Sequence, residues 1–149
     1  MMLASTVRKT VTYLKTLSKL HIQLTVEGNP VPQGSFRHVG NGRIIAANPK
    51  LNTWRQTIAD QIAPQTSHRL IDGSIRVDLV FTLPRPKTVT RASPTTKPDI
   101  DKLTRAVLDA ISLEKYCQII KDDSMVTDIH VAKRYANNNP PGVRINISW

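Results

Sequence analysis

The sequence predicts a small single-domain protein of the α/β (α+β) class, with strands and helices mixed along the chain. Its 149 residues are enough for one domain with its own hydrophobic core. Segments in which apolar and polar residues alternate, as in half-buried strands, occur beside segments whose apolar residues recur every three or four positions, as on one face of a helix. No run of residues approaches the roughly 18 apolar residues that a membrane span requires, so we expect no membrane association.

Four strands and two helices follow from these periodicities. The predicted strands cover residues 21–26, 74–83, 125–131 and 143–149. A helix from Asn48 to Ile62 is indicated by apolar residues three and four positions apart, with Asn48 as its cap and Pro49 in its first position. A second helix, from Asp99 to Ile111, is the clearest element, because one apolar face runs along its whole length.

The remaining segments are predicted as an extension and loops. Residues 1–20 hold four basic and no acidic residues, which is typical of a surface helix or loose extension and also resembles an organelle transit peptide. We favour a basic N-terminal extension in front of one domain over residues 21–149. Proline and glycine mark residues 30–48 as a loop, and residues 84–98, which lack an apolar period, are expected to form a mobile loop. Residues 137–142 are expected to be a hairpin loop that pairs the last two strands.

The net charge of +10 favours a polyanionic partner, because lysine and arginine neutralise phosphates and release counterions. A merely basic, well-solvated protein is the alternative. The distribution of charge is more informative than the total. Residues 99–128 hold seven of the eleven acidic residues against four basic ones, a net charge of −3, whereas the remaining residues have a net charge of +13. An acidic island that attracts a cation, within a basic body that attracts phosphate, is what a metal-dependent nuclease requires.

Two pairs of aspartates are the candidate metal ligands. Asp99 and Asp101 stand at the start of the second helix, where two close carboxylates would repel each other unless a hard cation such as Mg²⁺ lies between them. Helix capping is the alternative role for either residue. Asp122 and Asp123 precede the strand that begins near residue 125, and a solvated turn is their alternative. We expect the N-terminal ends of this helix and this strand to meet, so that Asp99, Asp101 and Asp123 converge on one divalent metal that cuts DNA backbone.

Other catalytic chemistries lack a matching pattern. The single cysteine, Cys117, excludes an internal disulfide and a cysteine-based zinc cluster, and no serine–histidine–acid, cysteine–histidine, Walker or dinucleotide-binding pattern occurs. The histidines lack metal-ligand spacing, and His38, in the first basic loop, is the one best placed to touch phosphate. Trp54 is expected in the core, whereas Phe36 fits either the core or a wedge against unstacked bases.

The acidic motifs also resemble a known family. The segment KPDIDKLTRAVLDAI at residues 97–111, followed by KDDSMV at residues 121–126, is similar to the signature of RusA-type Holliday junction resolvases, which are crossover junction endodeoxyribonucleases of bacteria and their prophages. The segment GNPVPQGSFR at residues 28–37 resembles the first loop of that family, and Lys133 matches a basic residue that follows its last acidic pair. The resemblance spans about residues 21–149, the predicted endonuclease domain.

The resemblance implies a small RusA-like fold, a mixed β-sheet with helices packed on it, and a homodimer that resolves four-way DNA junctions by paired phosphodiester hydrolysis in recombination and repair. It implies Mg²⁺, or Mn²⁺ in its place, as the cofactor, and a cytoplasmic location in a bacterium or in the host of a phage. Asp99, Asp101 and Asp123 correspond to the catalytic, metal-binding acids, with Asp122 adjacent as a further ligand. Arg105 stands at the position of the catalytic lysine, where it would stabilise negative charge in the transition state.

The sequence departs from the family pattern at several positions. Lys102 replaces a usual asparagine, Met125 replaces a usual glutamine, and a short insertion lies between Asp109 and Asp123. Arg105 keeps a positive charge but hardly deprotonates, so it cannot readily donate a proton. Two alternatives therefore stay open: a catalytically weakened junction-binding protein, and a metal nuclease that acts on other branched or single-stranded DNA.

Contacts with the DNA backbone are assigned to basic residues around these motifs. The expected contact residues are Arg37, His38, Arg43, Lys97 and Lys133. Because phosphate contacts release counterions, we expect the affinity for DNA to fall steeply as the salt concentration rises.

Overall fold

The computed structural model describes residues 20–34, 36–46, 48–66 and 70–149. The extension predicted for residues 1–20 therefore lies outside the described part, apart from its last residue. In chain order the elements are β1 (His21–Glu27), β2 (Phe36–His38), β3 (Ile44–Ala46), α2 (Lys50–Ile62), the 3₁₀ helix η1 (Ala63–Thr66), β4 (Ile75–Leu83), α3 (Ile100–Ser112), the 3₁₀ helix η2 (Asp123–Met125), β5 (Val126–Tyr135) and β6 (Gly142–Ser148). None of the described helices has the length and apolar character that crossing a membrane requires.

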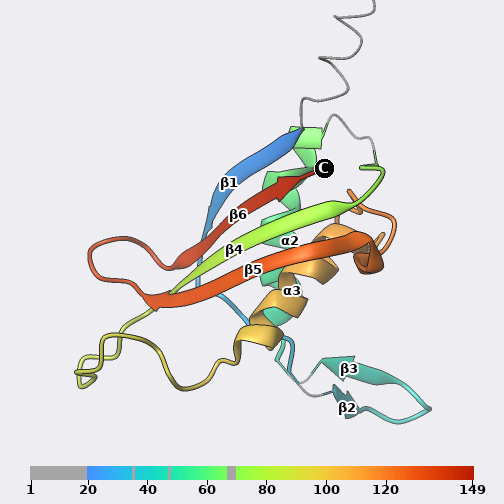
Figure 1. The fold of residues 1–149 in the computed structure, drawn as a ribbon. Helices are drawn as coiled ribbons and strands as arrows, with labels where there is room; N and C mark the ends of the chain where they lie inside the picture. Colours follow the sequence, from blue (N-terminus) through green and yellow to red (C-terminus); the bar gives the residue numbers. More distant parts are fainter. Residues whose placement is uncertain (1–19, 35, 47, 67–69) are drawn as a thin grey trace, which may run out of the picture.

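A mixed four-stranded sheet forms the centre of the fold, in the order β1-β6-β4-β5. β4 pairs antiparallel with β6 and parallel with β5, while β6 also pairs antiparallel with β1. The two α-helices contact each other and pack behind the sheet in the view of Figure 1. Alternate residues of β4 are buried, as its sequence pattern predicts. The predicted α/β (α+β) class, with helices packed on a mixed sheet, is confirmed.

The pairing predicted for the last two strands is wrong, because β4 separates β5 from β6. Residues 136–141 cross the end of β4 instead of turning back in a hairpin. The Ala136 N–H donates to the Leu83 carbonyl at 2.7 Å, and the Gly28 N–H donates to the Pro141 carbonyl at 3.0 Å. The physical reason is that β5 returns to β4 through a helix and pairs with it in parallel, which leaves the opposite edge of β4 for β6.

α3 is the crossover helix that parallel pairing of β4 with β5 requires. It begins one residue after Asp99 and ends at Ser112, close to the predicted limits. Leu103, Val107 and Ile111 are fully buried against the rest of the core. Because the helix carries the chain back along the sheet, it runs opposite to both strands (Figure 1).

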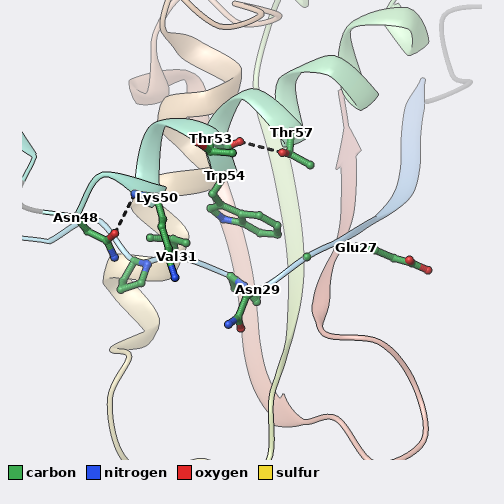
Figure 2. Close-up of a pocket in the computed structure, with 11 residues that line it drawn as sticks. Glu27, Asn29, Val31, Asn48, Lys50, Thr53, Trp54 and Thr57 are labelled. Carbon is green, nitrogen blue, oxygen red and sulfur yellow. Dashed lines mark hydrogen bonds between the residues drawn. The ribbon is translucent and has the colours of Figure 1, made fainter.

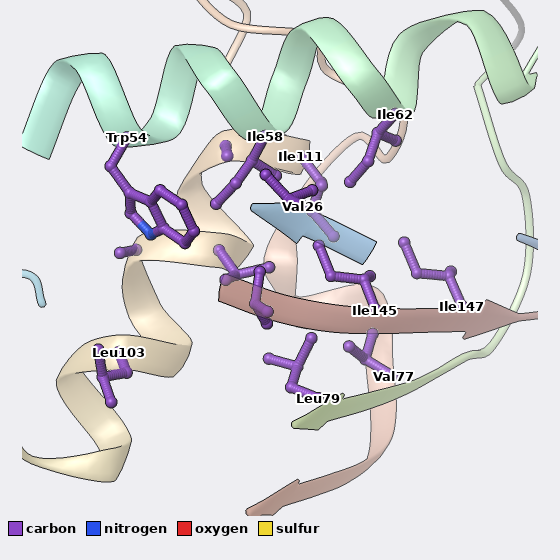
Figure 3. Close-up of a cluster of buried hydrophobic side chains, with 14 of the residues drawn as sticks. Val26, Trp54, Ile58, Ile62, Val77, Leu79, Leu103, Ile111, Ile145 and Ile147 are labelled. Carbon is purple, nitrogen blue, oxygen red and sulfur yellow. The ribbon is translucent and has the colours of Figure 1, made fainter. Parts of the chain in front are cut away.

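α2 packs its apolar face into the same core (Figure 3). The Asn48 carboxamide oxygen accepts a hydrogen bond from the Lys50 N–H at 3.0 Å, so Asn48 satisfies the start of the helix, which begins at Lys50 rather than at Pro49. Trp54 is buried, which confirms its predicted place in the core, and Ile58 beside it is fully buried. The three-and-four spacing of the sequence is therefore the spacing of residues that face the sheet.

Part of the segment predicted as a loop, residues 30–48, folds as a second sheet of two short antiparallel strands, β2 and β3. This hairpin projects from the body of the molecule near the N-terminal end of α3 (Figure 1). Gly40, Asn41 and Gly42 all have positive φ in its turn, a conformation that glycine and asparagine adopt at little steric cost. Strands of three residues are too short for an alternating pattern to be visible in the sequence.

Residues 84–98 contain no helix or strand, as predicted. The Arg85 guanidinium donates to the carbonyls of Val89 and Arg91 and lies over the Tyr135 ring, 4.8 Å from its centre. These contacts give the loop a defined path across the end of β5, and the mobility expected from its composition stays a prediction.

The close approach of β6 to β1 gives a first prediction. A Cβ atom at Gly142 would lie 2.2 Å from the carbonyl oxygen of Val26, a backbone atom that cannot move without disturbing β1. We expect Gly142→Ala to lower the free energy of unfolding, measured in urea, by about 1–3 kcal/mol or more, as overpacking usually does. Gly34→Ala is the matched control, because nothing lies within 4 Å of a Cβ atom there. Equal stability of the two variants would contradict this packing.

Candidate functional site

Asp99 lies at the N-terminal end of α3 with an extended backbone, at φ −72° and ψ 141°. Its side chain makes no hydrogen bond that caps the helix, and the residue is exposed. Of the two roles that the sequence leaves open for Asp99, capping by the side chain is therefore absent. The carboxylate is free to bind a cation.

Asp101 follows in the first turn of α3 and is also exposed. The Lys102 Nζ lies 3.0 Å from its Oδ2. This hydrogen bond is the main cause that lowers the pKa of Asp101 below its usual value. The first turn of α3 thus offers two carboxylates of the kind that Mg²⁺ binds.

Asp122 and Asp123 lie in the turn that leads into β5. The Asp122 carboxylate accepts a hydrogen bond from the Ser124 N–H at 2.8 Å and so caps η2. Hydrogen bonds from Ser124 lower the pKa of Asp122. Asp123 is the first residue of η2 and is half-buried. Asp122 therefore has the turn-capping role that its sequence left open as an alternative.

Within one chain, the structure does not bring Asp123 to the pair at the start of α3. α3 has 13 residues and a length of about 20 Å at 1.5 Å per residue. Asp99 is at its N-terminal end, whereas η2 lies beside its C-terminal end (Figure 1). Among the described residues, no three histidine, cysteine, aspartate or glutamate side chains are grouped so that they could hold a metal ion. The expectation that the N-terminal ends of this helix and of β5 meet is wrong for a single chain, because a crossover helix runs opposite to its strands.

Lys133, a predicted DNA contact, supports the start of α3 from β5. Its ammonium donates to the carbonyl of Thr96 at 2.7 Å and to the carbonyl of Pro98 at 2.9 Å. Pro98 directly precedes Asp99, so Lys133 fixes the segment that leads into the free carboxylate. A contact of Lys133 with DNA stays a prediction, and its role inside the chain is additional to it.

Arg105, at the predicted position of the catalytic cation, is more than half exposed on the next turn of α3. Its Nε donates to Asp109 Oδ1 at 3.2 Å. Residues four apart lie on the same helix face, so Asp101, Arg105 and Asp109 follow one another along one side of α3. Asp109 thereby restrains the guanidinium while leaving its Nη groups free to meet an anion.

Asp109 is itself part of a buried contact that joins three segments. The Arg55 guanidinium of α2 donates to Asp109 Oδ2 at 2.5 Å and to the side-chain carbonyl oxygen of Gln33. The Gln33 N–H donates to the Lys102 carbonyl at 2.9 Å, which ties the first loop to α3. Sequence reasoning missed Gln33 and Arg55 as supporting residues. The sequence signal that could have revealed this contact was one charged residue on the apolar face of each helix, Arg55 on α2 and Asp109 on α3.

The other predicted DNA contacts lie on the β2–β3 hairpin and in the segment just before α3. Arg37, His38 and Arg43 are on the β2–β3 hairpin and are exposed, and Lys97 is exposed two residues before Asp99. A cleft of about 630 Å³ connects the stem of the hairpin with the start of α3. Its lining residues are Pro32, Gln33, Gly34, Lys97, Pro98, Asp99 and Lys102.

A second cleft lies between the first loop and the N-terminal half of α2 and holds none of the predicted acids (Figure 2). One wall of this cleft is formed by α2 and the residues just before it, through Asn48, Lys50, Thr53 and Thr57. Trp54 lies deeper, between this wall and the loop. Thr57 donates to the Thr53 carbonyl at 2.9 Å, so its hydroxyl is committed to the helix. The chemistry of the candidate site is therefore concentrated at the start of α3.

Comparison with known proteins identifies the family of the chain. Residues 27–148 match the model of a family described as endodeoxyribonuclease RusA. The chain is also 32% identical over 140 residues to a Bacillus subtilis (strain 168) protein named uncharacterized protein YqaN, a similarity that covers 85% of this chain and 94% of that protein. The family match confirms the resemblance that the acidic motifs indicate.

The buried contact gives a second prediction. Asp109→Asn leaves the Arg55 guanidinium buried without a countercharge, so we expect the free energy of unfolding to fall by about 3–5 kcal/mol in urea denaturation. Asp60→Asn is the control, because Asp60 is an exposed acid on α2 that accepts only from Gln56 at 2.7 Å, and surface changes stay within about 0.5 kcal/mol. A loss no larger than that of the control would show that Arg55 does not depend on Asp109.

Proposed function

Because the chain belongs to the RusA endodeoxyribonuclease family, we propose that it is a Mg²⁺-dependent endonuclease that resolves four-way DNA junctions by paired hydrolysis of phosphodiester bonds in recombination and repair. The observation that carries the proposal is the pair of exposed carboxylates, Asp99 and Asp101, at the start of α3, with no capping bond on Asp99. A net charge of +10 favours a polyanionic substrate. The proposed place of action is the cytoplasm of a bacterium or of the host of a phage.

The acids suit a hard cation, because Mg²⁺ takes oxygen ligands from one or two carboxylates together with waters and substrate phosphate. Asp99, Asp101 and Asp123 would hold Mg²⁺, or Mn²⁺ in its place, with Asp122 next to them. When bound, such a cation supplies Lewis-acid polarisation of the scissile phosphate and a more acidic water. Aspartates are anionic at neutral pH, as ligation needs, and hydrogen bonds lower the pKa values of Asp101 and Asp122 further.

The basic side chains around the acids orient and stabilise the phosphate. Arg105 lies one helical turn after Asp101, and its bond to Asp109 holds it on that side of α3. An arginine stays protonated, so its contribution is electrostatic stabilisation of the charge that develops on the phosphate. Lys97 and Lys102 line the same cleft as Asp99 and would hold the DNA backbone beside it.

The homodimer is the arrangement that reconciles the three acids with the fold. In one chain the pair at the start of α3 and Asp123 lie at opposite ends of the helix, about 20 Å apart by its length. A two-fold related copy could set its own Asp123 beside Asp99 and Asp101, which would give two equivalent sites per dimer. Two such sites on a two-fold symmetric junction account for paired cuts.

Two other activities follow from the same residues if cleavage of junctions is absent. Arg105 in place of a lysine leaves a catalytically weakened protein that binds junctions without cutting them. Cleavage of flaps or single strands at rates above those for four-way junctions would instead indicate a nuclease for other branched DNA. Comparing these substrates across a titration of Mg²⁺ and Mn²⁺ separates the three activities.

The metal assignment gives a third prediction. Asp101→Asn removes a charged ligand, so we expect the rate of nicking of a synthetic four-way junction in Mg²⁺ to fall by at least about 100-fold, a loss of roughly 2.7 kcal/mol of transition-state stabilisation. Asp60→Asn, an exposed acid on α2, is expected to cut at the wild-type rate. Junction cleavage that persists in Asp101→Asn would exclude the metal role of this residue.

A mixing experiment tests whether two copies share each site. Asp101→Asn and Asp123→Asn proteins are each expected to be inactive. After subunit exchange, a mixed dimer with shared sites has one site with both wild-type acids, so we expect about one quarter of the wild-type nicking activity to return in an equal mixture. The regained activity should nick single strands of the junction rather than make paired cuts. If all three acids came from one copy, the mixture would stay inactive.

A further inference from the structure

The β2–β3 hairpin exposes an unusual share of the apolar surface. Four of the nine large hydrophobic side chains exposed in the described part of the chain lie within residues 36–45. They are Phe36 at 60% exposed, Ile44 at 54%, Ile45 at 42% and Val39 at 40%. Of the two places that the sequence allowed for Phe36, the core is therefore excluded. Side chains held this far out of the core by regular pairing call for a partner that covers them.

The register of the hairpin separates these side chains into two faces. Phe36 and His38 lie on one face with Ile44, which is directly opposite His38. Arg37 lies on the other face, opposite Ile45. Val39 and Arg43 close the turn, with the Val39 N–H donating to the Arg43 carbonyl at 3.0 Å, so they continue the second face. The first face thus carries the aromatic ring of Phe36 with Ile44, and the second carries the two guanidinium groups beside Ile45 and Val39.

We infer that the hairpin is a wedge that stacks Phe36 on unpaired bases next to the exchange point of a junction, while Arg37 and Arg43 hold the flanking phosphates. The inference rests on the proposed function. In that function, Phe36 is the residue that separates the DNA strands. Residues 28–59 contain no acidic residue, so the charge around the hairpin is complementary to a polyanion. Aromatic side chains stack on any base, which suits a protein that recognises branched shape rather than sequence.

The place of the hairpin supports this occupant. The Gln33 N–H bonds to the Lys102 carbonyl in the first turn of α3, and Gln33 shares a cleft with Asp99. The three residues from Gln33 to Phe36 span at most about 10 Å. Phe36 therefore lies no farther from the start of α3 than the length of a few nucleotides. Figure 1 shows the hairpin projecting from this end of α3. Bases opened by Phe36 would therefore lie close to the phosphate beside Asp99.

The test uses the full chain without divalent metal and a four-way junction that carries 2-aminopurine at the exchange point. We expect wild-type protein to change the fluorescence of the probe, and Phe36→Ala to abolish this change and bind the junction about 5- to 150-fold more weakly, the range for one lost base stack. Phe36→Trp should retain both properties because it keeps the stacking surface. Leu70→Ala, which removes an equally exposed apolar side chain elsewhere, should behave as wild type.

Three outcomes would overturn the inference. Unchanged probe fluorescence and affinity in Phe36→Ala, with wild-type protein still cutting junctions in Mg²⁺, would remove the wedge and leave the proposed function standing. Dissociation of a dimer by Phe36→Ala, seen by sedimentation, would show that a second copy covers the hairpin. Wild-type protein that neither binds nor cuts junctions would remove the wedge and the proposed function together.

Discussion

Arg55 and Asp109 meet between α2 and α3 with only 7% and 10% of their side chains exposed. Removing two charges from water costs several kcal/mol per ion, so this pair persists only because each group is bonded on more than one side. Arg55 also bonds Gln33 of the first loop, and Asp109 also bonds Arg105 at the surface of α3. One buried contact therefore fixes the relative positions of both helices, the first loop and Arg105.

That contact explains how loops on the surface can hold a defined site. The Gln33 side chain accepts a hydrogen bond from the buried Arg55, and its N–H donates to the Lys102 carbonyl. Gln33 thereby connects the core to the backbone of α3. Lys133 constrains the other side, from β5 to Pro98. The start of α3 is thus supported from two directions, and Asp99 does not have to supply its own cap. The Asp99 carboxylate makes no capping bond and is close in sequence to the Asp101 carboxylate, so the two negative charges repel each other. A bound cation would relieve this repulsion.

The elements that bury an apolar face could be predicted from the sequence. The relative positions of strands and acids, which depend on the topology, could not. Burial imposes a period of two on β4 and a period near 3.6 on α2 and α3, so their limits could be predicted within a residue or two. Nothing in β6 indicates whether it pairs with β4 or β5, and three-residue strands leave no period at all. The acids were found by type and spacing, but their separation along α3 follows from the crossover. Arg55 was missed because an arginine is ordinarily solvated.

Separating the acids along α3 has a consequence for control of cutting. If one copy contributes Asp99 and Asp101 and the other contributes Asp123, a lone chain holds an incomplete ligand set and binds the cation weakly. Cation binding and association of the two copies are then linked by mass action, because each stabilises the state that the other requires. A junction that binds both copies at once would favour the complete sites, and ordinary duplex that holds one copy would not. The basic charge that attracts any DNA would then not by itself lead to its cleavage.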